Sequence, residues 1–146
     1  ATGARVSELV QIKVEHLHCG YLDLYSKGGK LRRIYFPDAL CEEALMWCEE
    51  KGQASGFLFL NRGGQKISTR GIHTQLKHYA RKYGIDPDTV YPHSFRHLFA
   101  KNFLSRFNDI SLLADFMGHE SIETTRIYLI RSSREQQKLL DEIITW

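Results

Sequence analysis

The spacing of apolar residues along the chain predicts a small sheet and a series of helices. Residues 20–25 and 32–36 alternate apolar and polar positions as strands do, and the glycine-rich segment 26–30 predicts a β-hairpin turn between them. The apolar run at residues 57–60 predicts a further short strand. Five segments have helical periodicity, and three of them stop at a glycine: residues 6–12, 37–51, 70–83, 93–107 and 109–116. The expected fold class is therefore α+β, mainly α, with a small antiparallel sheet.

Three of the helical segments have an apolar side that predicts where they pack. In segment 37–51 this side consists of Leu40, Ala44, Trp47 and Cys48. In segment 93–107 it consists of Phe95, Leu98, Phe99 and Phe103. Two capping-box patterns, which begin at Ser132 and Ser133, predict a last helix over residues 133–146 that also has an apolar side. This last side either folds back on its own core or contacts another molecule.

Length and composition restrict the class of protein more than its function. A chain of 146 residues suits one compact domain, and it holds no apolar run long enough to span a bilayer. The N-terminus has neither an initiator Met nor a secretory signal, so we expect an excised fragment that lacks an N-terminal part. Three cysteines without a C-x-x-C pair favour a reducing, cytosolic setting and buried thiols. The net charge of +3 permits nucleic-acid binding but does not imply it.

One predicted helix begins with residues that suit an anion. His93 and Arg96 are three positions apart and share one side of the helix, where unpaired backbone N–H groups also favour negative charge. Taken alone, the pair is more often a surface histidine and arginine of a soluble helix. His93 and His97 have the spacing of two zinc ligands, but Ser94 stands where a zinc protease needs glutamate, and no third ligand is evident. We therefore expect no metal, and we interpret His97 as a hydrogen-bonded, partly buried support.

The order of several short motifs is more informative than any of them alone. Arg5 lies in the segment Thr-Gly-Ala-Arg-Val-Ser-Glu-Leu, and Lys27 lies in Lys-Gly-Gly-Lys-Leu-Arg on the predicted hairpin. His-Ser-Phe-Arg-His at residues 93–97, Gly-His at residues 118–119 and Tyr128 follow. Together these motifs resemble the tyrosine recombinase (phage integrase) family across essentially the whole chain. Met117 departs from the leucine that is usual before Gly-His, which conserves volume.

The resemblance implies a DNA breaking-rejoining fold and a chemistry for each motif. Tyr128 would attack a DNA phosphate and form a 3′-phosphotyrosine, while Arg5 and Arg96 clamp the phosphate oxygens. A tyrosine hydroxyl has a reference pKa of about 10, so it needs a base and cationic neighbours at neutral pH. The implied catalytic residues are Arg5, Lys27, His93 (base), Arg96, His119 (a further donor to the phosphate) and Tyr128 (nucleophile). Lys27 would protonate the leaving 5′-oxygen, and Lys30 is its rival on the same loop.

The resemblance also implies a setting for this chemistry. Residues 1–146 would be the catalytic domain of a cytoplasmic, nucleoid-associated recombinase whose N-terminal core-binding domain is absent from this chain. The expected partner is double-stranded DNA, bound by a tetramer in which the helix at residues 133–146 docks on a neighbouring subunit. The expected function is site-specific recombination or integration, typical of mobile genetic elements, without metal or other cofactor. Two alternatives remain, namely relaxation by a type IB topoisomerase and a DNA-binding module that has lost catalysis.

Overall fold

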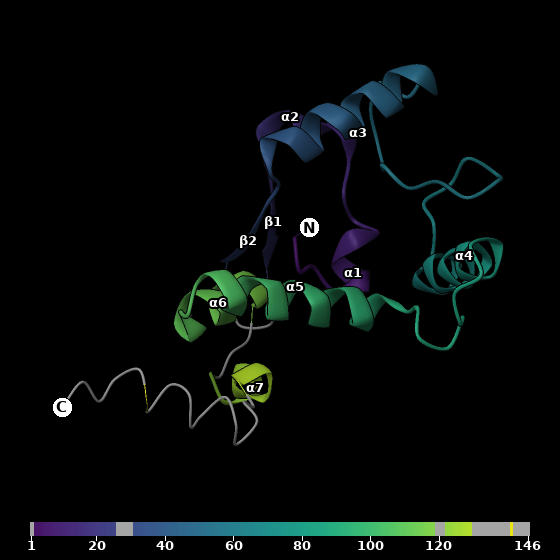
Figure 1. Cartoon of the computed structure of the whole chain (residues 1–146). Coiled ribbons are helices and arrows are strands. Elements are labelled where there is room, and N and C mark those ends of the chain that lie inside the picture. Colours follow the sequence, from purple (N-terminus) through teal and green to yellow (C-terminus); the bar gives the residue numbers. More distant parts are fainter. Residues whose placement is uncertain (1, 26–30, 119–121, 130–140, 142–146) are drawn as a thin grey trace.

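The computed structural model describes residues 2–25, 31–118, 122–129 and 141. Figure 1 shows a short antiparallel hairpin between a pair of helices, α2 and α3, and a layer that contains α5 and α6. In chain order the elements are α1 (Val6–Leu9), α2 (Val14–Cys19), β1 (Tyr21–Tyr25), β2 (Leu31–Tyr35), α3 (Asp38–Glu50), α4 (Thr69–Lys82), α5 (Pro92–Arg106), α6 (Ile110–Met117), α7 (Ile122–Arg126) and the 3₁₀ turn η1 (Ile127–Leu129). The predicted α+β class, mainly helical with a two-stranded sheet, is confirmed. No helix in these ranges is long and apolar enough to cross a membrane.

The hairpin has one apolar face, which packs into the fold, and one polar face. Its register pairs Leu22 with Ile34 and Leu24 with Arg32, and side chains alternate across a strand, so these residues point to the same side. Leu22 and Ile34 are buried there. On the other side, Asp23 accepts two hydrogen bonds of 2.7 Å from Arg33. Arg32 is therefore a charged side chain on the inward face of the sheet.

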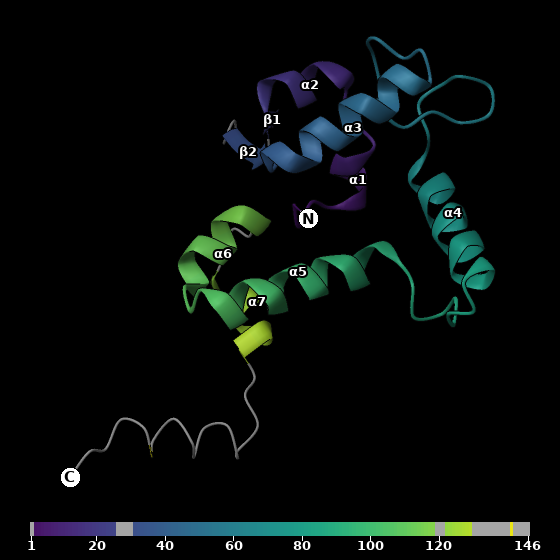
Figure 2. The ribbon, with the colours of Figure 1, turned by 45° about the horizontal axis from the view of Figure 1, so that its top comes forward.

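Two apolar clusters hold the helices in place. The first lies between the hairpin, α2 and α3, and its buried members include Val14, Leu17, Leu22, Ile34, Cys41 and Cys48. The second joins α5 to α6 through Ala100, Leu113 and Met117, and Tyr128 packs against it. Figure 2 separates α5 and α6 from α2 and α3, with α1 between them near the N-terminus. The N-terminal segment therefore lies between the two clusters.

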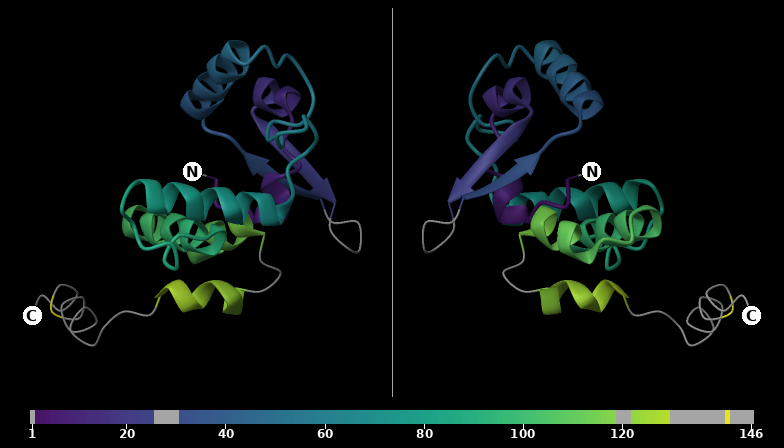
Figure 3. Two further views of the ribbon diagram at one scale, coloured as in Figure 1. Left: turned by 90° about the vertical axis from the view of Figure 1, so that its right-hand side faces the viewer. Right: turned by 90° about the vertical axis from the view of Figure 1, so that its left-hand side faces the viewer.

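Glycine and aspartate fix the junctions that lead to the second cluster. Asp109 caps α6 by accepting a 2.9 Å hydrogen bond from the Leu112 N–H. Gly118 ends α6 with φ of +58°, a conformation that L side chains rarely adopt. Figure 3 shows α7 below the α5–α6 layer, and the η1 turn contacts α5.

Two elements differ from the sequence prediction. Helix α2 was not predicted, because its six residues carry only two buried positions, Val14 and Leu17, and give too short a periodic signal. The apolar run at residues 57–60 is not a strand. Its two ends pair with different segments, through isolated bridges from Phe57 to Lys13 and from Leu60 to Lys66. The run therefore links the segment at Lys13 to the segment at Lys66 and forms a continuous ladder with neither.

The predicted packing sides of α3 and α5 were partly wrong. Trp47 is 42% exposed, because the buried side of α3 runs through Cys41 and Cys48. On α5, Phe95 and Leu98 are exposed, since the side that packs against α6 carries Ala100. The thiols of Cys41 and Cys48 are buried as expected, whereas Cys19 is exposed. The predicted helix at residues 133–146 lies outside the described residues, except for residue 141.

Candidate active site

Arg5 is held at the start of α1 by a nearby carboxylate. Its backbone N–H donates to Glu8 Oε2 at 2.6 Å, and its Nη1 donates to Glu8 Oε1 at 3.0 Å. Its Nη2 reaches across the fold and donates to the Gly118 carbonyl at 2.8 Å. Glu8 is only 7% exposed, whereas 41% of the Arg5 side chain is exposed. Arg5 can therefore offer charge to a ligand while Glu8 orients it.

Arg96 reaches the same place from the second turn of α5. Its guanidinium is buried and donates to the Gly3 carbonyl and, at 2.6 Å, to the Met117 carbonyl. Gly3 has φ of +65° and lies directly on Phe99, where an added Cβ would approach the ring to 2.6 Å. The glycine of the Thr-Gly-Ala-Arg motif thus permits the close approach that presents its carbonyl to Arg96.

A third guanidinium, which the sequence did not single out, completes this group. Arg32 donates to Glu8 Oε1 through Nη1 and to the Phe116 carbonyl through Nη2 at 3.0 Å. Three arginines therefore bind three successive carbonyls at the end of α6: Arg32 binds Phe116, Arg96 binds Met117 and Arg5 binds Gly118. We call Arg5, Arg32 and Arg96 the arginine cluster. Carbonyls in the last turn of a helix lack partners within the helix, so the cluster also caps α6.

The cluster concentrates positive charge. Burial, followed by the charges of Arg5 and Arg32, lowers the pKa of Arg96 from 12.5 to about 10. Burial also lowers the pKa of Arg32, and Glu8 opposes that change. A guanidinium keeps its charge at neutral pH, and the described contacts pair Arg5 and Arg32 with the Glu8 carboxylate. Three positive charges against one negative charge leave a net charge of +2, which favours an anion with several acceptor oxygens.

Tyr128 lies beside this group on the η1 turn. Its ring packs edge-on against His97 with 5.1 Å between ring centroids, and it also packs against the apolar cluster of Ala100, Leu113 and Met117. Met117, whose carbonyl Arg96 binds, belongs to that cluster, so Tyr128 and Arg96 both contact the end of α6. His97 is exposed rather than partly buried, and the contact that the structure records for it is this ring contact. The prediction of a partly buried His97 was therefore wrong.

The remaining predicted site residues differ in what the structure says of them. His93 is exposed in the first turn of α5, one turn before the buried Arg96. Lys27 and Lys30 come between β1 and β2 in the sequence, and His119 directly follows Gly118. All three lie outside the described residues. Among the residues that are described, no three His, Cys, Asp or Glu side chains gather as metal ligands.

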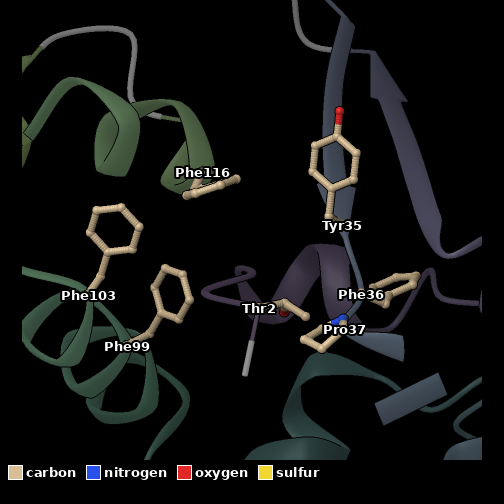
Figure 4. Close-up of a pocket in the computed structure, with 7 residues that line it drawn as sticks. All are labelled: Thr2, Tyr35, Phe36, Pro37, Phe99, Phe103 and Phe116. Carbon is tan, nitrogen blue, oxygen red and sulfur yellow. The ribbon is translucent and has the colours of Figure 1, made fainter. Parts of the chain in front are cut away.

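An apolar cavity of about 290 Å³ lies near the arginine cluster. Figure 4 shows Phe99, Phe103 and Phe116 on one side of it and Tyr35, Phe36 and Pro37 on the other, with Thr2 between them. Of the predicted catalytic residues that the structure describes, none lines this cavity. The anion-binding groups are thus adjacent to the largely apolar cavity and not inside it.

One feature of the sequence could have identified Arg32. In a strand whose alternate residues are buried, position 32 falls on the same side as Ile34, so a charge there must find partners inside the fold. The Lys-Gly-Gly-Lys-Leu-Arg motif was interpreted only for its lysines. The arginine that ends the motif is the residue that ties the hairpin to the site.

Comparison with known proteins agrees with this geometry. The family model described as "Phage integrase family" matches residues 1–135. Tyrosine recombinase XerA of Pyrococcus furiosus is 35% identical over 155 residues, which cover 98% of this chain and 53% of that protein. Tyrosine recombinase XerD of Staphylococcus epidermidis is 33% identical over 147 residues, which cover 95% of this chain and 50% of that protein. The chain spans about half the length of these relatives.

Solved structures show the same fold. The crystal structure of XerA recombinase matches 99% of this chain and 55% of its own, with a TM-score of 0.77 and 24% identity. A post-cleavage complex of the XerH site-specific recombinase with palindromic difH substrate matches 95% of this chain and 42% of its own, with a TM-score of 0.75 and 24% identity. The family model covers most of the chain, and the curated relatives exceed 30% identity over nearly all of it. By these matches the chain belongs to the phage integrase family of tyrosine recombinases.

Proposed function

We propose that this chain is the catalytic part of an enzyme that cuts and rejoins DNA through a covalent 3′-phosphotyrosine at Tyr128. The observation that carries the proposal is the arginine cluster beside Tyr128, where Arg5 and Arg96 bind neighbouring carbonyls although they are far apart in sequence. A phosphodiester gains negative charge on its non-bridging oxygens as it is attacked. A preorganised group with a net charge of +2 is suited to stabilise that charge.

The proposed reaction exchanges one phosphoester for another. The Tyr128 oxygen attacks the phosphorus, the bond to the 5′-oxygen of the next nucleotide breaks, and a phosphotyrosine ester forms on the 3′ side. His93 takes the proton from the Tyr128 hydroxyl, and Lys27 gives a proton to the leaving 5′-oxygen. Arg5, Arg96 and His119 bind the phosphate oxygens throughout. Because the ester conserves the bond energy, a 5′-hydroxyl from another strand can reverse the step without ATP.

A basic helix supports double-stranded DNA as the partner. Helix α4 carries four Lys or Arg residues and no acidic residue, and nearly all of these basic side chains are exposed: Arg70, Lys77, Arg81 and Lys82. Such a helix can neutralise phosphates along a DNA backbone and release their counterions. We therefore expect the affinity for DNA to fall steeply as salt rises.

For the whole protein we propose site-specific recombination or integration. The relatives are named tyrosine recombinases, and one structural neighbour is a transposon integrase in complex with transposon end DNA. We also propose that the full-length protein acts as a tetramer on DNA in the cytoplasm and that residues 133–146 dock on a neighbouring subunit. The proposal includes a core-binding domain N-terminal to this chain, because the chain matches only half of each relative.

The test is covalent capture of DNA by the full-length protein. A library of labelled, nicked duplexes of random sequence is incubated with the protein. DNA that stays attached to the protein in denaturing detergent is then recovered and sequenced. We expect a defined site to be recovered with the wild-type protein and no adduct with Tyr128→Phe, which should still bind that site. The matched control is Tyr83→Phe, an exposed tyrosine after α4, which should form the adduct normally.

The same experiment separates the alternatives. An adduct in Tyr128→Phe would refute the assignment of the nucleophile. DNA binding without any adduct in the wild-type protein would favour a binding module that has lost catalysis. A topoisomerase would relax supercoiled plasmid without a preferred site, whereas a recombinase joins two copies of the captured sequence.

A further inference from the structure

We propose that Arg32 is a positioning residue of this active site, which holds Arg5 and the 116–118 carbonyls in the geometry that binds the phosphate. The inference rests on the proposed function and adds a residue whose role that function does not include. It concerns a side chain that reaches the site from the hairpin, not from the helices that carry Arg96 and Tyr128.

The contacts of Arg32 reach two other members of the site. Its Nη1 shares Glu8 Oε1 with Arg5, so a single carboxylate oxygen fixes the separation of the two guanidiniums. Its Nη2 binds the Phe116 carbonyl, two residues before the Gly118 carbonyl that Arg5 binds. Arg5 is therefore constrained from both sides, by Glu8 and by the end of α6, and Arg32 contacts both.

Arg32 is itself closely packed. Only 12% of its side chain is exposed, and a Cβ built on Gly118 would overlap its Nε, Cδ and Cζ atoms. Its Nε is buried and makes no hydrogen bond in the described part of the chain. The edge of the guanidinium thus lies directly on the backbone that precedes His119. Its position sets how close that backbone comes to the site.

These contacts predict a specific defect when Arg32 is changed. Methionine keeps the aliphatic length but removes both hydrogen bonds, which leaves Glu8 bound to Arg5 alone and frees the Phe116 carbonyl. Lysine keeps the charge but cannot donate a planar fork to two acceptors at once. Because a shift of about 1 Å in a positioned group costs on the order of 100-fold in rate, we expect Arg32→Met to cleave about 100-fold more slowly. Arg32→Lys should be intermediate.

A buried positioning residue should affect cleavage and not DNA affinity. Arg32 offers little surface to DNA, so its loss should leave the dissociation constant unchanged while the rate of adduct formation falls. Arg33 is a suitable control, since it lies on the opposite face of the same strand and pairs with Asp23. Arg33→Met removes the same charge from the neighbouring position and should cleave at the wild-type rate.

The experiment measures single-turnover adduct formation on the captured nicked site by the full-length protein, together with its affinity for that DNA. Each variant is also tested on the same DNA with a 5′-thio leaving group, which departs without a proton donor. Lys27→Ala should recover on the thio substrate because its proposed role is the acid. Arg32→Met should stay slow on both substrates, because it acts through the groups that bind the phosphate oxygens.

Several outcomes would overturn the proposal. One is that Arg32→Met cleaves at the wild-type rate, and another is that its cleavage rate recovers on the thio substrate. A third is that Arg32→Met and Arg33→Met both lose DNA affinity and cleavage rate to the same extent. A wild-type protein that forms no adduct on any captured DNA would instead refute the proposed function. That result is distinct from normal cleavage by Arg32→Met.

Discussion

Substituting Gly118 with alanine should destabilise the fold far more than the same substitution at an otherwise similar glycine. Gly118 has φ of +58°, and a Cβ there would overlap the Arg32 side chain. Gly84 has φ of +67° at the end of α4, and a Cβ there would meet no atom within 4 Å. Both residues follow a helix in the left-handed conformation, so the two substitutions differ mainly in the contact with Arg32.

The expected magnitudes follow from these two effects. Placing an alanine in the left-handed region costs about 1–2 kcal/mol, and Gly84→Ala should lose only this amount. Gly118→Ala must also displace Arg32 from Glu8 and the Phe116 carbonyl. Leaving such buried groups unpaired adds about 1–3 kcal/mol. We therefore expect Gly118→Ala to lose about 3 kcal/mol of unfolding free energy, a large share of the total for a domain of this size.

Urea denaturation followed by circular dichroism gives the unfolding free energy of each variant. The decisive comparison is a double-mutant cycle with Arg32→Ala, which removes the atoms that the new Cβ would overlap. In that background Gly118→Ala should lose no more unfolding free energy than Gly84→Ala does. The coupling energy between Gly118→Ala and Arg32→Ala should then be about 2 kcal/mol, within the range for residues in contact. Equal costs for the two glycines, or no relief in the Arg32→Ala background, would refute the close packing of Arg32 on Gly118.

Three other predictions follow from packing, capping and charge. Leu113→Ala should lose about 2–5 kcal/mol of unfolding free energy because Leu113 is fully buried, whereas Leu112→Ala, at a residue 41% exposed, should lose much less. Asp109→Ala should lose about 1 kcal/mol by removing the cap of α6, and a loss near zero would contradict the capping bond. The Arg33 hydrogen bond lowers the pKa of Asp23 below 3.8, so its stabilising effect is present above that pH and disappears as the pH falls through the lowered value. Arg33→Met should remove this part of the acid dependence in urea titrations at a series of pH values, and an unchanged dependence would argue against the pair.

The sequence predicted most of the fold where local signals were strong. Helices α4 and α6 were predicted to within one residue at each end because each has a periodic pattern that stops at a glycine, Gly84 or Gly118. Helix α2 was missed because its stability comes from tertiary burial of Val14 and Leu17 and not from a long periodic pattern. The outward position of Trp47 was missed for a related reason, since a helix with apolar residues on several sides does not reveal which side is buried.

The site was predicted in its residue types more than in its connections. Motif order was enough to predict Arg5, Arg96 and Tyr128 as neighbours, although they come from three parts of the chain. That Arg5 and Arg96 each bind a carbonyl at the end of α6 could not be predicted. The position of those carbonyls is fixed only when α6 packs on α5 through Leu113. Arg32 was overlooked since its charge gave no indication of its burial.

The bonds that hold the arginine cluster join the N-terminal segment to α5 and to the end of α6, and this has a consequence for folding. Arg5 binds a carbonyl 113 residues away, and Arg96 binds one 93 residues away. Contacts between such distant segments are slow to form, because the chain between them must first be ordered. A chain still emerging from the ribosome, or one only partly folded, therefore lacks the paired arginines. The proposed capacity to cut DNA would therefore arise only when folding is complete.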